Sequence, residues 1–187
     1  MSSRVCPWWM GYLLLSPLRR AFQDPAQILA PYVRPGMTVL EPGPGMGFFT
    51  LELARLVGPS GHVMAVDIQS RMLDGLRRRA VKAGLADRVT TRVVQPDSLS
   101  VSDLAGQVDF VLAFALVHEL PNARTFFANA AASLKPGGAL LLAEPTGHVS
   151  ADAFEDELQA AAAAGLALQE RPSIRSNRTG LLVKAGN

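Results

Sequence analysis

The chain has 187 residues, of which 49% are hydrophobic, and this predicts a globular protein with a sizeable core. Its net charge is +2, from 18 basic and 16 acidic residues, a balance that argues against a dedicated nucleic-acid surface. Cys6 is the only cysteine, which excludes an intramolecular disulfide and a multi-cysteine zinc site and favours a reducing, cytoplasmic location.

Residues 1–34 are predicted to form an N-terminal helical segment that acts as a lid. The apolar run Val5–Leu15 holds Trp8, Trp9 and Tyr12, which suit one wall of an apolar pocket. Two prolines interrupt the region, and the run is too short to span a bilayer, so neither a signal peptide nor stable membrane insertion is expected. Packing on the flank of the domain, or contact with a membrane surface, is the alternative.

Residues 35–187 are predicted to form the main domain, in which strands alternate with helices. One of the helices, Met72–Ala83, carries the basic run 77–79, which we interpret as a solvated face. This alternation predicts right-handed βαβ units and a mainly parallel, doubly wound sheet. The last two strands have no convincing helix between them and should form a terminal hairpin. The expected strands are Thr38–Leu40, His62–Val66, Val89–Val94, Val108–Ala113, Ala139–Ala143, Leu166–Arg171 and Thr179–Val183.

Three alternating glycines, Gly43, Gly45 and Gly47, join the first predicted strand to the helix after it. Such a turn lets a ligand approach bare backbone at the N-terminus of the helix. Glu41 lies two residues ahead of the first glycine. A dinucleotide fingerprint would need glycine where Phe48 stands, so the spacing argues against a nicotinamide cofactor. A glycine-rich turn without catalytic meaning is the alternative.

Asp67 ends the second predicted strand, 20 residues after Gly47. This separation is the one expected between a glycine-rich turn and an acid that binds ribose. A carboxylate in this place can accept hydrogen bonds from both ribose hydroxyls. The alternative is that Asp67 caps the helix that starts near Ser70.

The G-x-G-x-G turn with its preceding acid resembles motif I of the class I S-adenosylmethionine-dependent methyltransferases. Three later segments resemble family motifs in the same order and spacing: Gln95-Pro96-Asp97-Ser98, Val108–Leu120 and Leu134–Gly138. The resemblance covers Pro35–Lys184 and looks most like small-molecule methyltransferases related to the ubiquinone and menaquinone biosynthesis enzymes. It implies a Rossmann-like α/β fold with a seven-stranded, mainly parallel sheet and a C-terminal antiparallel hairpin.

The resemblance also implies S-adenosylmethionine as cofactor and a small molecule as methyl acceptor. No resident metal is expected, and the oligomeric state is not predicted. Neither Asn-Pro-Pro-Tyr nor Asp-Pro-Pro-Tyr follows the fourth strand, and no inserted domain is available to grip a macromolecule, so nucleic acid is not expected as a partner. The implied cofactor-binding residues are Glu41, Gly43, Gly45, Gly47, Asp67, Ile68, Asp97, Ser98 and Phe114.

His118, Glu144 and His148 are the candidate catalytic residues, because they follow the fourth and fifth predicted strands at the edge where open α/β sheets bind ligands. Methyl transfer depends mainly on alignment, and it needs a general base only when the acceptor must lose a proton. Imidazole suits that role because it titrates near neutrality. Alternatively, His118 bonds local backbone and His148 is a solvent-facing loop residue. A catalytically silent, cofactor-binding scaffold and an NAD-dependent oxidoreductase are the alternative functions.

Overall fold

The computed structural model describes residues 23–95 and 98–186. These residues form two compact units, 23–94 and 95–186. Most of the predicted lid, including Trp8, Trp9 and Tyr12, lies outside the described residues, as do Cys6 and Asp97. The assignment of a lid to residues 1–34 therefore stays a prediction.

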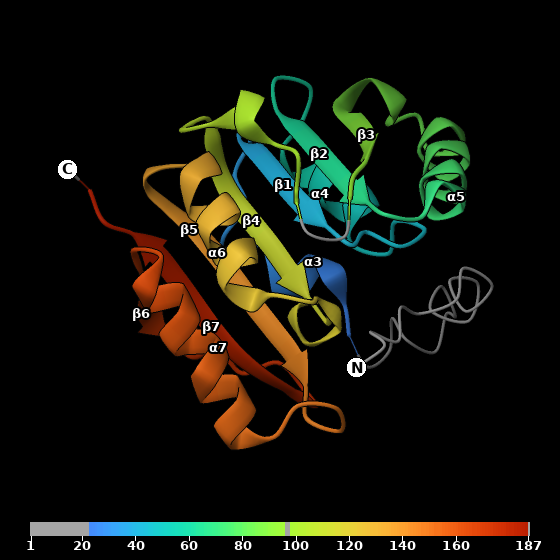
Figure 1. The fold of residues 1–187 in the computed structure, drawn as a ribbon. Helices are drawn as coiled ribbons and strands as arrows, with labels where there is room; N and C mark the ends of the chain where they lie inside the picture. The colour runs from blue at the N-terminus through green and yellow to red at the C-terminus, as the bar shows by residue number, and fades with distance from the viewer. Residues whose placement is uncertain (1–22, 96–97, 187) are drawn as a thin grey trace. The chain divides into compact units, whose positions relative to one another are not determined.

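The first unit contains the glycine turn and three parallel strands (Figure 1). Strand β2 pairs with β1 on one side and β3 on the other, and helix α5 lies against β2 and β3. Both β1 and β2 are buried almost throughout, as expected of parallel strands covered on both faces. The elements are α3 (Pro25–Leu29), β1 (Thr38–Pro42), α4 (Thr50–Leu56), β2 (His62–Asp67), α5 (Ser70–Lys82), η1 (Ala86–Arg88) and β3 (Val89–Val93).

The second unit ends in the predicted hairpin. Strand β4 pairs in parallel with β5, which pairs antiparallel with β7, and β7 pairs antiparallel with β6. Helices α6 and α7 lie side by side over these strands (Figure 1). The elements are η2 (Ser102–Leu104), β4 (Val108–Phe114), η3 (Val117–Glu119), α6 (Ala123–Ser133), β5 (Leu134–Pro145), α7 (Ala151–Ala163), β6 (Leu166–Glu170) and β7 (Asn177–Lys184).

The seven strands belong to one sheet in the order β3-β2-β1-β4-β5-β7-β6. The sheet is mainly parallel, and within the described residues its antiparallel strand pairs are those of the C-terminal hairpin strands β6 and β7. This confirms the predicted fold class, a Rossmann-like α/β sheet with a terminal hairpin.

One boundary differs clearly from its prediction. Strand β5 begins at Leu134, whereas the predicted strand begins at Ala139. Helix α6 ends at Ser133 because Leu134 already has extended backbone angles, and Pro136 disfavours the helical conformation in the residue before it. The pairing of β4 with β5 shifts register between Leu134 and Ala139, so the residues between them form an irregularity within the strand.

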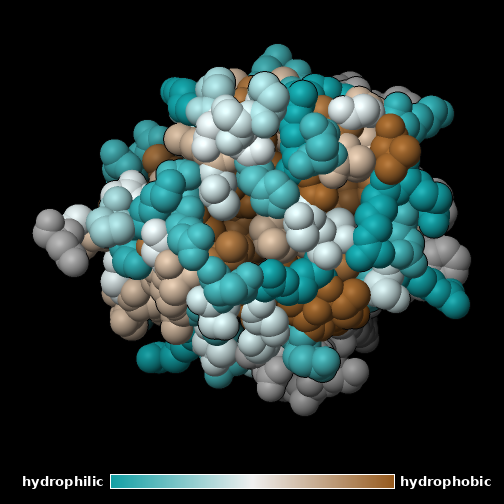
Figure 2. Space-filling view, turned by 90° about the horizontal axis from the view of Figure 1, so that it is seen from above, coloured by the Kyte–Doolittle hydropathy of each residue, from teal (hydrophilic) through white to brown (hydrophobic). Residues whose placement is uncertain are grey.

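Exposed apolar side chains are scattered over the surface. The face in Figure 2 is mostly hydrophilic, with hydrophobic residues in smaller groups. Within the described residues, the large hydrophobic side chains that are exposed, Val81, Val93 and Leu168, belong to three different elements. Single exposed residues of this kind need no partner to explain them. Among the helices that the structure describes, none has both the length and the apolar character required to cross a membrane.

Candidate active site

The glycine turn adopts backbone conformations that favour glycine. Gly43, Gly45 and Gly47 have φ values of +66°, +55° and +85°, in the left-handed region. The amide of Gly43 donates to the carbonyl of Val66 over 2.8 Å, and that of Gly47 donates to the carbonyl of Pro44 over 3.0 Å. These bonds tie the turn to β2 and close it on itself before α4 begins.

Gly45 and Gly47 are required for different reasons. A Cβ atom at Gly45 would meet nothing within 4 Å, so the backbone there borders open space. A Cβ at Gly47 would lie 2.4 Å from Cδ1 of Leu76 on α5. Gly47 therefore lets α5 approach the turn closely, whereas Gly45 leaves backbone accessible to a ligand.

Helix α5 also holds the turn through Arg79, which donates a hydrogen bond from Nη1 to the carbonyl of Met46. On the same helix, a Cβ at Gly75 would lie 2.9 Å from Cγ of Met46. The interpretation of the basic run as a solvated face is therefore wrong for Arg79, although it fits Arg77 and Arg78, which are exposed. The sequence did not predict this role because a charged residue is expected to face solvent, although Arg79 lies next to inward-facing residues of the helix.

Glu41 is a buried carboxyl beside the turn, only 3% exposed. Among the described residues, its Oε2 atom has no hydrogen-bond partner, and the same is true of the buried Oγ1 of Thr50, the first residue of α4. Burial raises the pKa of Glu41 to about 7; the nearby Thr50 hydroxyl opposes this shift and the Asp67 carboxylate adds to it. Two buried oxygens beside a glycine turn fit a ligand that supplies hydrogen-bond donors or positive charge.

Asp67 ends β2 and is 9% exposed. Its Oδ1 atom accepts a hydrogen bond from the amide of Gln69 over 2.8 Å, just before α5 begins. The side chain thus bonds the backbone just ahead of α5, whose N-cap is Gln69, and does not cap the helix as the alternative interpretation expected. Binding of ribose by Asp67 and the neighbouring half-buried Ile68 stays a prediction.

Two other residues that the resemblance implied for the cofactor lie in the second unit. Phe114 is the half-buried last residue of β4. Ser98 bridges to Gln95, and its hydroxyl accepts a hydrogen bond from the amide of Ser100 over 3.0 Å. Their roles toward a cofactor stay predictions.

Glu144, near the carboxyl end of β5, is fully buried and hydrogen-bonded. Its Oε1 atom accepts from the amides of Leu116 and Val117, at 3.1 and 2.7 Å. Ala115 has a φ of +52°, an uncommon conformation for a residue with a side chain, and it turns the chain directly after β4. The turn directs the two following amides to the Glu144 carboxylate.

The other oxygen of Glu144 bonds the imidazole of His118, through Nδ1. The alternative in which His118 bonds local backbone is therefore wrong. The hydrogen bond to Glu144 raises the pKa of His118, and the charge of Glu144 acts in the same direction, whereas burial opposes the shift. His148 is exposed in the loop after β5, as the alternative for it expected, yet its ring stacks edge-on against His118 with centroids 5.5 Å apart.

A further acid, Glu157 on α7, belongs to this cluster and was missed from the sequence. It is 9% exposed, and its Oε2 atom has no hydrogen-bond partner among the described residues. Burial raises its pKa to about 8; the charge of Glu144 adds to the shift and that of His118 opposes it. One signal could have found it, since Glu157 lies between Phe154 and Leu158 on the buried face of α7.

The comparisons with known proteins agree with this geometry. The family described as a methyltransferase domain matches residues 39–138. A ubiquinone/menaquinone biosynthesis C-methyltransferase from Brucella anthropi is 31% identical over 137 residues, which cover 72% of this chain and 51% of that protein. An arsenite methyltransferase from Halobacterium salinarum is 32% identical over 125 residues, which cover 67% of this chain and 30% of that protein.

Among solved structures, an S-adenosylmethionine-dependent methyltransferase from Aquifex aeolicus superposes with a TM-score of 0.83 at 24% identity, covering 96% of this chain and 98% of that one. The chain belongs to the methyltransferase-domain family, and it shares the fold of this S-adenosylmethionine-dependent enzyme. It spans about half of the length of the first relative and less than a third of the second.

Proposed function

We propose that this chain binds S-adenosylmethionine and transfers its methyl group to a small-molecule acceptor. The observation that carries the proposal is the buried carboxyl of Glu41, whose Oε2 has no hydrogen-bond partner among the described residues, beside a glycine turn whose backbone is bare at Gly45. S-Adenosylmethionine carries an ammonium and a sulfonium group, which suit a buried carboxylate. The proposed cofactor-binding residues are those that the resemblance implied, with Thr50 and the positioning residue Arg79 added.

For methyl transfer, the protein chiefly has to bind the cofactor and the acceptor, align their reacting atoms and exclude water. When bound, S-adenosylmethionine supplies a methyl group that its positive sulfur has already activated. We assign His118 the role of accepting a proton from the acceptor at Nε2, because Nδ1 bonds Glu144 and no described residue bonds Nε2. Glu144 is a positioning residue that holds the ring and stabilises its protonated form, and exposed His148 lies beside them.

An imidazole base serves acceptors that lose a proton when they are methylated, such as hydroxyl, amine or acidic carbon groups. The names of the two relatives above differ, since one refers to ubiquinone and menaquinone biosynthesis and the other to arsenite, so these names leave the acceptor of this chain open. A single cysteine offers no set of thiols for a metalloid. We therefore favour a small organic acceptor with an ionisable X–H bond.

Calorimetric titration tests which cofactor the chain binds, with S-adenosylmethionine, S-adenosylhomocysteine and NAD(H) as ligands. We expect the first two to bind and NAD(H) not to bind. Asp67→Ala should weaken binding about ten- to a hundredfold, through loss of roughly 1.5–3 kcal/mol with a charged acceptor. Equal affinities of wild type and Asp67→Ala would remove the ribose role, and preferential binding of NAD(H) would contradict the proposal.

Transfer is tested separately, by release of S-adenosylhomocysteine in the presence of hydroxyl, amine, carbon-acid and arsenite acceptors. Turnover on one of the organic acceptors supports the proposal. Tight cofactor binding without turnover on any acceptor would favour the catalytically silent alternative.

A further inference from the structure

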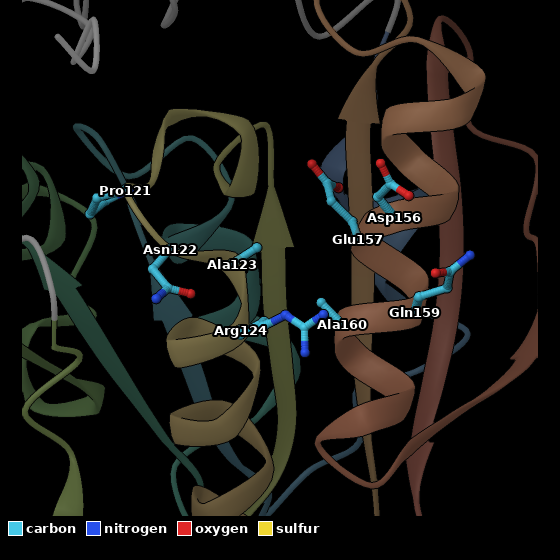
Figure 3. Close-up of a pocket in the computed structure, with 8 residues that line it drawn as sticks. All are labelled: Pro121, Asn122, Ala123, Arg124, Asp156, Glu157, Gln159 and Ala160. Carbon is cyan, nitrogen blue, oxygen red and sulfur yellow. The ribbon is translucent and has the colours of Figure 1, made fainter. Parts of the chain in front are cut away.

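A pocket of about 390 Å³ lies between the start of α6 and the middle of α7, within the second unit. Figure 3 shows Asn122 and Arg124 on the α6 side and Asp156, Glu157 and Gln159 on the α7 side. Its volume is in the range of sites that hold small molecules. The proposed function does not use this pocket.

Glu157 distinguishes the pocket from an ordinary surface groove. The side chain projects from α7 toward the α6 side (Figure 3), and it is nine-tenths buried. Its Oε2 atom has no hydrogen-bond partner among the described residues. The last torsion of a glutamate side chain is broad, so rotation of the carboxyl group can present either oxygen to the pocket. A buried carboxyl without a partner indicates a missing donor.

Once Glu157 is ionised, the charges around the pocket favour a cation. Asp156 and Glu157 contribute two carboxyl groups, against the single guanidinium of Arg124. Arg124 is exposed and forms no ion pair with either acid in the described part of the chain. Gln159 also lines the pocket and is uncharged. The carboxylates of Asp156 and Glu157 would repel an anion, whereas a cation with an N–H group could donate a hydrogen bond to Glu157.

We propose that this pocket binds a small organic cation that carries N–H donors, such as an alkylammonium group. The proposal does not depend on methyl transfer, because no residue that lines the pocket is assigned to cofactor binding or to proton transfer in the proposed function. Within the described residues, no cluster of acidic, histidine or cysteine side chains is arranged to hold a metal ion, so an organic cation suits the site better.

Ligand binding should be coupled to ionisation of Glu157. The groups that face this carboxyl are Glu144 from β5, His118 from η3, Arg124 from α6 and Asp156 from α7 itself. Burial raises the pKa of Glu157 to about 8, so the acid is mostly protonated at pH 7. A cation prefers the ionised form, and its binding should release a proton.

The test uses n-butylamine as the probe, titrated into the full chain without S-adenosylmethionine and followed by amide NMR shifts. Its ammonium group resembles that of lysine and stays protonated to about pH 9. With the Glu157 pKa near 8, the probe should bind about tenfold more tightly at pH 9 than at pH 7. The saturable shifts should centre on Glu157 and Gln159, and the isosteric probes n-butanol and butyrate should cause none.

Three variants sharpen the test. Glu157→Gln keeps the shape of the side chain, and it should lose both the binding and its pH dependence. Asp152→Asn removes an exposed acid of α7 outside the pocket and should bind as the wild type does. Arg124→Ala removes the like charge and should bind more tightly. No saturable shift, equal binding by Glu157→Gln, or preference for butyrate would overturn the proposal. Because S-adenosylmethionine is absent, none of these results bears on cofactor binding.

Discussion

Glu41 is a buried carboxyl whose ionisation its surroundings oppose. Its pKa rises from 4.5 to about 7, which corresponds to about 3 kcal/mol. Because the folded-state pKa is raised, this penalty is absent below pH 4.5, grows as the pH increases, and is complete above pH 7. A cationic ligand would offset it.

Glu41→Gln separates these two effects. In the free protein the substitution removes a buried charge, so it should stabilise the fold at pH 8 by up to about 3 kcal/mol and change little at pH 4.5. Affinity for S-adenosylmethionine should fall at least about tenfold, because a charged acceptor is lost. Urea denaturation and calorimetry measure the two quantities. If the variant is no more stable than the wild type at pH 8 and binds S-adenosylmethionine normally, burial does not oppose ionisation of Glu41 and the ligand does not use its carboxylate.

His118 and Glu144 should act as a unit in transfer. Because the Glu144 carboxylate raises the pKa of His118, the transfer rate should rise with pH through an apparent pKa above 6.5. Glu144→Gln should lower that apparent pKa and slow transfer, with cofactor affinity unchanged. His118→Ala should slow transfer by about 10²–10⁴-fold.

The pH profile of single-turnover transfer tests this pair once an acceptor is known. His62 is the matched control, since it bonds Thr90 in the other unit and His62→Ala should leave the profile as it is. If Glu144→Gln reproduces the wild-type profile, Glu144 does not act through His118.

At the scale of elements, helix α5 packs against the glycine turn and holds it in place. The Leu76 side chain occupies the place that a side chain at Gly47 would take, and Gly75 lies against Met46. Arg79 donates a hydrogen bond to the Met46 carbonyl. Arg79→Ala removes this charge-assisted bond and should weaken cofactor binding about three- to thirtyfold, corresponding to roughly 0.7–2 kcal/mol.

Arg78→Ala is the control for Arg79, because Arg78 belongs to the same basic run and is exposed. Its affinity for S-adenosylmethionine should match the wild type. Calorimetry on both variants separates the two explanations. Equal losses of affinity would indicate that the total positive charge of the helix matters, and no loss in either variant would show that cofactor binding does not need the Arg79 hydrogen bond.

Strands β1, β2 and β4 were predictable from the sequence because they are parallel strands buried on both faces, which form short, continuous apolar runs. Element ends were harder, as β5 shows, because the residues Lys135–Gly138 look like a helix stop and yet belong to the strand. The glycine turn was predictable because its chemistry is local. The contacts of Arg79, Glu144 and Glu157 were not, because each depends on which distant residues the fold brings beside a polar group.

At the scale of the whole molecule, three shifted groups act on stability in one direction. Glu41 and Glu157 have raised pKa values, so their ionisation destabilises the fold as the pH rises. His118 also has a raised pKa, and its contribution to stability is present below pH 6.5 and lost as the pH rises through the folded-state value. All three predict a free protein that is more stable in mild acid than in mild base.

The free energy of unfolding should therefore fall between pH 5 and pH 9 in the absence of ligands, by about 3 kcal/mol from Glu41 alone and by more with Glu157 and His118. Urea denaturation at fixed temperature measures it across that range. The double variant Glu41→Gln, Glu157→Gln should flatten the curve. A free protein whose stability rises across this range would contradict the assignment of these two acids as buried groups whose ionisation destabilises the fold.

The central claim is that the glycine turn binds S-adenosylmethionine through bare backbone, and calorimetric titration of Gly45→Ala beside Gly84→Ala tests it most directly. Both glycines have positive φ values, +55° and +67°, and a Cβ at either meets nothing within 4 Å, so each substitution should cost about 1 kcal/mol of stability. We predict that Gly45→Ala loses at least about tenfold in affinity while Gly84→Ala binds as the wild type does. Equal affinities in two folded variants would contradict the claim.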